Sequence, residues 1–116
     1  MHEFSLMESV LASAGQVARQ AGASKVTAVN LRIGRLSAVL PEAMQFAHQA
    51  LTPNTIFEAS ELRIDFVEAR SRCLSCGVEF AHDRFHRACP ECDSLATELL
   101  AGRELEIESI EVEDDN

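Results

Sequence analysis

Four cysteines in two pairs constrain this 116-residue chain more than any other feature of its sequence. The pairs are Cys73 with Cys76 and, after twelve intervening residues, Cys89 with Cys92. Two C-x2-C knuckles at this spacing are typical of a zinc ribbon, in which four thiolates surround the ion tetrahedrally. Because four sulfur ligands leave no open coordination position, we expect the zinc to be structural and not hydrolytic.

A thioredoxin-type redox motif is the competing interpretation of one C-x2-C pair, but that motif needs no second pair. Gly77 can adopt the positive φ angle that the first knuckle requires, and Pro90 stiffens the second turn. His82 and His86 lie between the pairs and could replace a cysteine ligand, although loop histidines beside four thiolates usually have no such role. A segment of roughly 30 residues buries too little apolar surface to fold alone, so zinc is expected to supply the missing stability.

The first predicted helix follows a local capping signal. Ser5 and Glu8 form a capping box, which starts the helix near Leu6 and leaves Met1 to Phe4 as a free arm. Apolar residues then recur at helical spacing until Gly22, which supplies a C-terminal stop. One face of this helix is therefore committed to a core.

A second helix is predicted to begin at Pro41, since proline is tolerated in the first turn, and to end before Pro53. His48 lies on its otherwise apolar side. We expect this histidine to be a packed or capped core residue and not a metal ligand.

Three segments are predicted to be strands, because apolar and polar residues alternate along them. They are residues 25–33, 62–66 and 103–112, and the last changes phase near Ser109, as at a β-bulge. The sequence thus predicts an α/β fold: a small two-helix, three-stranded mixed-sheet domain with an inserted zinc-ribbon module. Residues 1–69 together with 102–116 form the α/β domain, and residues 70–101 form the module.

The charge balance restricts the partners. With 19 acidic and 10 basic side chains the chain has a formal net charge of -9, and it lacks Trp and Tyr. Phosphate backbones are repelled and aromatic stacking platforms are missing, so no nucleic-acid partner is expected. No nucleophile-base pair and no Gly-rich phosphate loop are found, so we expect no enzymatic activity.

The N-terminal segment has no basic leader, and Glu8 and small polar residues interrupt its apolar residues. We therefore expect neither a signal peptide nor a membrane span, and a cytoplasmic location. In that reducing compartment, paired cysteines favour metal binding over disulfides.

Short motifs distributed along the chain carry a family resemblance. They are Met1-His2-Glu3-Phe4-Ser5-Leu6, Ile33-Gly34, Leu36-Ser37, Pro41-Glu42, the two cysteine pairs and Gly102-Arg103-Glu104-Leu105. Together these resemble the HypA/HybF hydrogenase maturation factors over nearly the whole chain. The resemblance implies a nickel metallochaperone that helps load the metal centre of NiFe hydrogenase. Its implied partners are a nickel-binding GTPase and the hydrogenase large subunit.

The resemblance also changes the interpretation of the N-terminus. Alone, His2 would be an ordinary surface residue of a terminal segment, and Glu3 an acid placed favourably ahead of a helix. Within the family pattern, nickel is expected at the Met1 amine, the His2 imidazole and the deprotonated backbone amides of His2 and Glu3. Such a square of nitrogen donors suits Ni(II) and disfavours tetrahedral zinc.

Three turns depart from the family pattern. Asn54-Thr55 stands where Gly-Thr is frequent, Ala59-Ser60 where Gly-Ala commonly precedes a strand, and Asp93 where glycine is usual. These changes leave the expected metal residues in place.

Two other functions compete with nickel delivery. The insert could be a zinc-ribbon protein-protein adaptor, with His2 incidental, or a nucleic-acid-binding ribbon, which the acidity disfavours. An exposed sheet edge or the zinc module could also mediate a homodimer.

Overall fold

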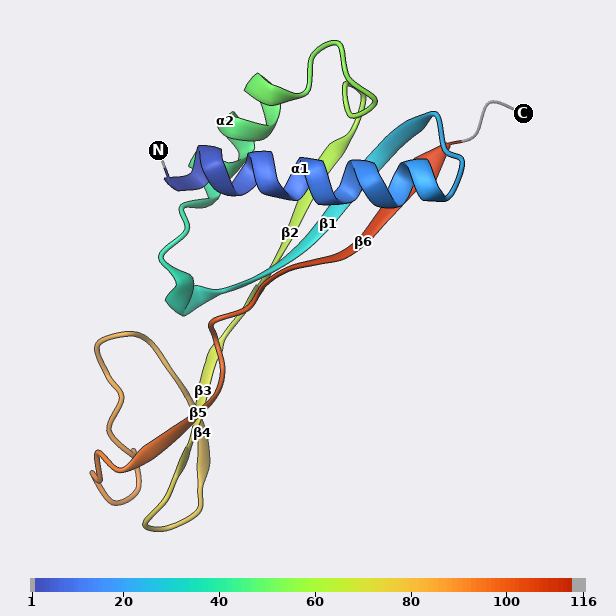
Figure 1. Ribbon diagram of the computed structural model, residues 1–116. Helices are drawn as coiled ribbons and strands as arrows, with labels where there is room; N and C mark the ends of the chain where they lie inside the picture. Colours follow the sequence, from blue (N-terminus) through green and yellow to red (C-terminus); the bar gives the residue numbers. More distant parts are fainter. Residues whose placement is uncertain (1, 114–116) are drawn as a thin grey trace. The chain divides into compact units, whose positions relative to one another are not determined.

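The computed structural model describes residues 2–113, which form two compact units (Figure 1). The helical unit comprises the described residues of Met1–Leu31, Val39–Asp65 and Glu106–Asn116, and the cysteine unit comprises Arg32–Ala38 and Phe66–Leu105. In chain order the elements are α1 (His2–Gln20), β1 (Lys25–Gly34), the 3-10 turn η1 (Arg35–Ser37), α2 (Pro41–Leu51), β2 (Glu61–Val67), β3 (Ala69–Cys73), β4 (Glu79–His82), β5 (Thr97–Ala101) and β6 (Leu105–Glu113). Within the described part of the chain, neither helix combines the length and the apolar character needed to cross a membrane.

The helical unit is built on a three-stranded sheet in the order β2-β1-β6. The helix α2 connects β1 to β2, and these two strands run in the same direction, whereas β6 runs against them (Figure 1). Both helices cover one face of this sheet. The predicted α/β class, with two helices and a three-stranded mixed sheet, is confirmed.

Alternation along the strands decides which side chains enter the core. Val29, Leu31 and Ile33 of β1 are buried, while Asn30 and Arg32 between them are only half-buried. Further buried side chains of the helical unit come from both helices, from β1 and β2, and from the segments on either side of α2. They are Met7, Ala14, Ala18, Val26, Ala28, Val39, Met44, Ala47, Phe57 and Leu62. Each such burial contributes up to about 1.5–3 kcal/mol for the larger aliphatic side chains.

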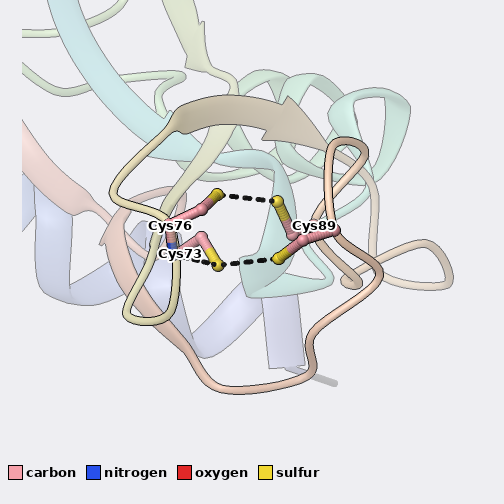
Figure 2. Close-up of side chains that lie close together, drawn as sticks. Cys73, Cys76 and Cys89 are labelled. Atoms are coloured by element: carbon pink, nitrogen blue, oxygen red, sulfur yellow. Dashed lines mark hydrogen bonds between the residues drawn. The ribbon is translucent and has the colours of Figure 1, made fainter.

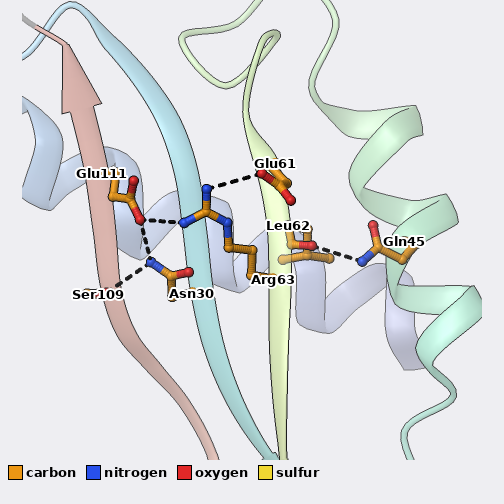
Figure 3. A network of polar contacts seen from close by, with 7 residues as sticks. All are labelled: Asn30, Gln45, Glu61, Leu62, Arg63, Ser109 and Glu111. Carbon is orange, nitrogen blue, oxygen red and sulfur yellow. Dashed lines mark hydrogen bonds and ion pairs between the residues drawn. The ribbon is translucent and has the colours of Figure 1, made fainter.

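Polar side chains connect the three strands of this sheet (Figure 3). Asn30 of β1 donates to the Ser109 hydroxyl at 3.0 Å and to the Glu111 carboxylate at 3.4 Å. Arg63 of β2 binds the same Glu111 at 2.5 Å and Glu61 at 3.1 Å. Exposed ion pairs contribute only about 0–1 kcal/mol each, so this network favours the strand register more than it stabilises the fold.

The start of α1 corrects the sequence-based prediction. The helix begins at His2 and not near Leu6, so the expected free arm is wrong for residues 2–4, and Met1 lies outside the described residues. Phe4 is half-buried, and the Glu3 carboxylate accepts a hydrogen bond from the Leu40 backbone N–H at 3.2 Å. These contacts extend the helix by one turn beyond the local capping box, and an acidic residue in the first turn also suits the helix dipole.

The end of α1 is as predicted. Gly22 has a φ of 73° and donates its N–H to the Arg19 carbonyl at 3.0 Å, while Ala23 donates to the Ala18 carbonyl at 3.0 Å. This pair of bonds is a Schellman motif.

The cysteine unit contains a second sheet, in the antiparallel order β4-β3-β5. Ser71 in the middle strand lies opposite Phe80 of β4 and Leu99 of β5. None of these three strands was expected from the sequence. The predicted third strand of the first sheet is present as β6, where Ile107 and Ile110 are half-buried, and the β-bulge near Ser109 stays a prediction.

Candidate metal centre

The four cysteine sulfur atoms converge, as the two-pair spacing predicts (Figure 2). All four Sγ atoms lie within 4.8 Å of one another, and two pairs, Cys73 with Cys92 and Cys76 with Cys89, are each 3.6 Å apart. A tetrahedron with metal-sulfur bonds of about 2.3 Å has edges of about 3.8 Å, whereas a disulfide needs about 2.05 Å. The cysteines are free, and their arrangement fits four thiolates around a tetrahedral ion.

Two backbone knuckles with the same geometry hold the sulfur atoms. Gly77 donates its N–H to the Cys73 carbonyl at 2.9 Å, and Asp93 donates to the Cys89 carbonyl at 2.9 Å. Both turn residues have positive φ angles, 82° for Gly77 and 61° for Asp93. In the first knuckle the Cys76 N–H also points to the Cys73 sulfur at 3.4 Å, a contact that favours a thiolate.

The role of Asp93 was missed in the sequence, although a signal for it exists. Gly77 and Asp93 each stand four residues after the first cysteine of their pair. Equal offsets in two knuckles imply the same backbone conformation, so the conformation expected of Gly77 applies to Asp93 as well.

The thiol groups influence one another electrostatically. The Cys76 N–H is the largest factor that lowers the pKa of Cys73, to about 6. The Ser94 N–H lowers the pKa of Cys92, but the three neighbouring cysteine sulfurs, that of Cys73 first, and desolvation together outweigh it and raise that pKa to about 12. Four adjacent thiolates repel one another, and a bound divalent cation removes that repulsion.

Apolar packing around the cluster is sparse. Cys73 and Cys89 are buried together with Phe80, and half-buried Val78 packs against them. So small a group supplies little hydrophobic stabilisation, which is the situation in which metal ligation can determine whether a segment folds.

The two histidines between the cysteine pairs have other partners. His82 belongs to β4 and not to a loop, and its ring nitrogens lie 2.8 Å from the Ser71 hydroxyl and 2.7 Å from the Asp83 carbonyl. His86 is exposed, and its Nδ1 lies 3.0 Å from the Asp83 carboxylate. The hydrogen bond from His86 is the largest factor that lowers the pKa of Asp83, to about 2. The expectation that neither histidine replaces a cysteine ligand stays a prediction.

The expected nickel residues fall in the first turn of α1. His2 is exposed, and Glu3 is half-buried with its carboxylate bonded to the Leu40 N–H, which is the largest factor lowering its pKa. The Met1 amine lies outside the described residues. Leu40 was not expected to touch this segment, and no local pattern in the sequence indicates such a long-range contact.

His48 is the packed core residue that the sequence predicts. Its side chain is 5% exposed, and its Nε2 lies 2.8 Å from the Ser60 hydroxyl. Burial lowers the pKa of His48 from its ordinary value of 6.5.

Known proteins share this architecture along the whole chain. A solved HypA protein structure has a TM-score of 0.72 at 23% identity, covering 99% of this chain and 98% of that one. The nickel metallochaperone HypA of Helicobacter pylori has a TM-score of 0.68 at 22% identity, covering 97% and 98%. At this identity the likeness shows a common fold.

Sequence comparison gives the family. The hydrogenase maturation factor HypA of Chlorobium luteolum is 36% identical over 99% of this chain and 98% of its own length. That of Geotalea uraniireducens is 40% identical over 97% of this chain and 100% of its own length. A family model described as hydrogenase/urease nickel incorporation, metallochaperone, matches residues 1–112. This chain therefore belongs to the HypA family of nickel metallochaperones in hydrogenase maturation.

Proposed function

We propose that this protein binds Ni(II) at its N-terminus and helps deliver it to NiFe hydrogenase, while zinc held by the four cysteines has a structural role. Membership of the HypA family is the observation that carries the proposal. No catalytic step is assigned to the chain.

The proposed nickel ligands are the Met1 amine, the His2 imidazole and the deprotonated amides of His2 and Glu3. The start of α1 at His2 does not prevent this, because the first N–H groups of a helix have no intrahelical acceptor. The exposed His2 side chain is accessible to an ion, and the bond between Glu3 and Leu40 steadies the turn that carries both amides. Nitrogen donors in a square suit Ni(II).

The proposed zinc ligands are Cys73, Cys76, Cys89 and Cys92. The sulfur-sulfur distances support four-coordinate zinc, which would leave no open position for substrate. We propose that residues 70–101 form a metal-dependent module and that 1–69 with 102–116 carry the nickel site. The two metals are then sorted by ligand type, with thiolates for zinc and nitrogens for nickel.

Delivery requires partners. We propose that this protein binds a nickel-binding GTPase of the maturation machinery and the hydrogenase large subunit in the cytoplasm. The GTPase is expected to recognise the helical unit near α1, because donor and acceptor must approach each other for metal transfer.

Nickel titration of the zinc-loaded protein with a native, untagged N-terminus tests the proposal. A nickel Kd near the micromolar range, which corresponds to a binding free energy of about 8 kcal/mol, would let the protein both carry nickel and release it. His2→Ala should abolish nickel binding and leave zinc content unchanged, whereas His86→Ala, at another exposed histidine, should retain it. One residue added before Met1 should also impair binding. A protein that binds no stoichiometric nickel would instead be a zinc-ribbon adaptor.

A further inference from the structure

A small polar hollow lies in the cysteine unit, and none of the proposed metal ligands lines it. Its volume is about 220 Å³, and two arginines line it: Arg87 from the segment after β4 and Arg103 from the segment before β6. Among residues 2–113, neither guanidinium has a hydrogen-bond or ion-pair partner. Arg72 on β3, by contrast, lies 3.8 Å from both Glu79 and Glu98. The hollow thus holds two uncompensated positive charges in a chain whose net charge is -9.

The other polar side chains that line the hollow, Ser71, His82 and Thr97, add no negative charge. A carbonyl only accepts, so His82 donates through Nδ1 to the Asp83 carbonyl at 2.7 Å. In the neutral ring its Nε2 therefore accepts the Ser71 O–H at 2.8 Å. The Thr97 hydroxyl, which also lines the hollow, has no partner within the described residues and is available as a donor. No carboxylate lines the hollow, so it is unsuited to a cation and suited to an anion.

The remaining walls distinguish between classes of anion. Leu36 and Leu99 line the hollow, and their methyl groups can pack against a carbon chain but not satisfy a fully hydrated phosphate. A water molecule occupies about 30 Å³ in the liquid, so the hollow holds roughly seven water-sized groups. That space fits a carboxylate with a short aliphatic stem.

We propose that this hollow binds an aliphatic carboxylate. Arg87 and Arg103 bind the carboxylate oxygens, since the planar guanidinium matches this group with paired N–H donors. The Thr97 hydroxyl donates a further hydrogen bond, and Leu36 and Leu99 pack against the stem. A free dicarboxylate and a glutamate side chain of an acidic protein segment present the same chemistry.

NMR titration of the zinc-loaded, ¹⁵N-labelled protein tests the proposal. The two probes are glutarate, a free dicarboxylate, and a capped tripeptide with one central glutamate, each compared with phosphate and chloride at matched ionic strength. At least one probe should give saturable shifts of the Arg87 and Arg103 Nε–H signals and of the Ser71 and Thr97 amides. Saturation by glutarate alone identifies a free carboxylate as the source, and saturation by the peptide identifies a protein segment.

Two variants and one control separate the hollow from general charge effects. Arg87→Gln and Arg103→Gln should each raise the Kd at least tenfold with unchanged zinc content. Arg84→Gln removes the same charge from an exposed residue of the same segment outside the hollow, and it should change the Kd less than twofold. Since Arg87 and Arg103 are both exposed and unpaired among the described residues, both variants are expected to fold. The proposal is overturned if neither probe saturates, if phosphate or chloride produces the same shifts, or if Arg84→Gln weakens binding as much as Arg87→Gln.

Discussion

The backbone of Gly34 lies so close to the carbonyl group of Gly102 that a Cβ atom on Gly34 would overlap it. Two hydrogen bonds maintain this approach: Gly34 donates to the Glu104 carbonyl at 2.7 Å, and Leu36 donates to the Gly102 carbonyl at 2.8 Å. Gly102 itself has a φ of 126°, which side chains rarely tolerate. Two glycines from distant motifs thus meet in one backbone contact of the cysteine unit.

Gly34→Ala should therefore destabilise the protein strongly. The added Cβ meets backbone atoms, which cannot move aside as a side chain can, so we expect a loss of about 3 kcal/mol or more in the free energy of unfolding. Urea unfolding of the zinc-loaded protein measures it. Gly22→Ala is the matched control, because Gly22 has a positive φ but nothing within 4 Å of an added Cβ. It should cost only about 1–2 kcal/mol, and equal losses for both variants would contradict the overlap.

The second knuckle should become more stable when Asp93 is replaced by glycine. Asp93 has a φ of 61°, a conformation that glycine adopts without steric cost. Asp93→Gly should stabilise this turn by about 0.5–1 kcal/mol and slow the loss of zinc to a chelator. The reciprocal change Gly77→Asp should accelerate zinc loss. If Asp93→Gly instead accelerates zinc loss, its side chain has a role beyond the turn.

Stability of the helical unit should decrease in mild acid because of His48. Burial holds the pKa of His48 below 6.5, whereas an unfolded chain has an ordinary histidine pKa near 6.5. Below that pH the unfolded state binds the proton more readily, so the free energy of unfolding falls as pH falls. Hydrogen exchange of α2 amides between pH 7.5 and 5.5 measures this, after correction for intrinsic exchange rates. His48→Gln should reduce the pH dependence, while His86→Gln at an exposed site should keep it. An unchanged dependence in His48→Gln would assign it to another group.

The sequence predicts those parts of this protein that rest on local or periodic signals. Alternation of apolar and polar residues predicts β1, and the proline at its first position predicts α2. The spacing of the cysteine pairs predicts the sulfur cluster. The predicted start of α1 was wrong because the local signal at Ser5 competes with a tertiary contact between Glu3 and Leu40, which are far apart in sequence. Strand β3 was not predicted, for a different reason. Its buried residue Ser71 is polar, and the Ser71 hydroxyl is hydrogen-bonded to His82 on β4. A polar residue at an inward position removes the alternation that identifies a strand.

The turns that depart from the family pattern follow local rules. Asn54 has a φ of 65°, a conformation that asparagine tolerates better than most residues other than glycine. Ser60 donates its hydroxyl to the Phe57 carbonyl at 2.6 Å and contacts His48. The contact between Ser60 and His48 is the one part of these turns that depends on the tertiary fold, because His48 lies on α2.

The last prediction concerns the dependence of the cysteine unit on zinc. Cys73 is buried, whereas Cys92 is exposed, so loss of apolar packing would make Cys73→Ala much more harmful than Cys92→Ala. Metal ligation predicts equal effects instead. Each cysteine supplies one of the four ligands, so both variants should lose zinc and unfold the unit alike. Zinc binding in small domains is worth on the order of 10 kcal/mol, far more than burial of one thiol.

Metal analysis and hydrogen exchange measure this dependence together. We expect one zinc per chain in the wild type, and loss of protection in β3, β4 and β5 but not in α1 or α2 of either variant. A chelator should produce the same pattern in the wild type. Ser75→Ala is the control: it removes a hydroxyl contact of 3.0 Å to Ser94 between the knuckles, which should cost about 1 kcal/mol and leave zinc in place. Unchanged protection between Arg70 and Ala101 after zinc removal would show that the unit folds without the metal, and a harmless Cys92→Ala would show that this sulfur is not a ligand.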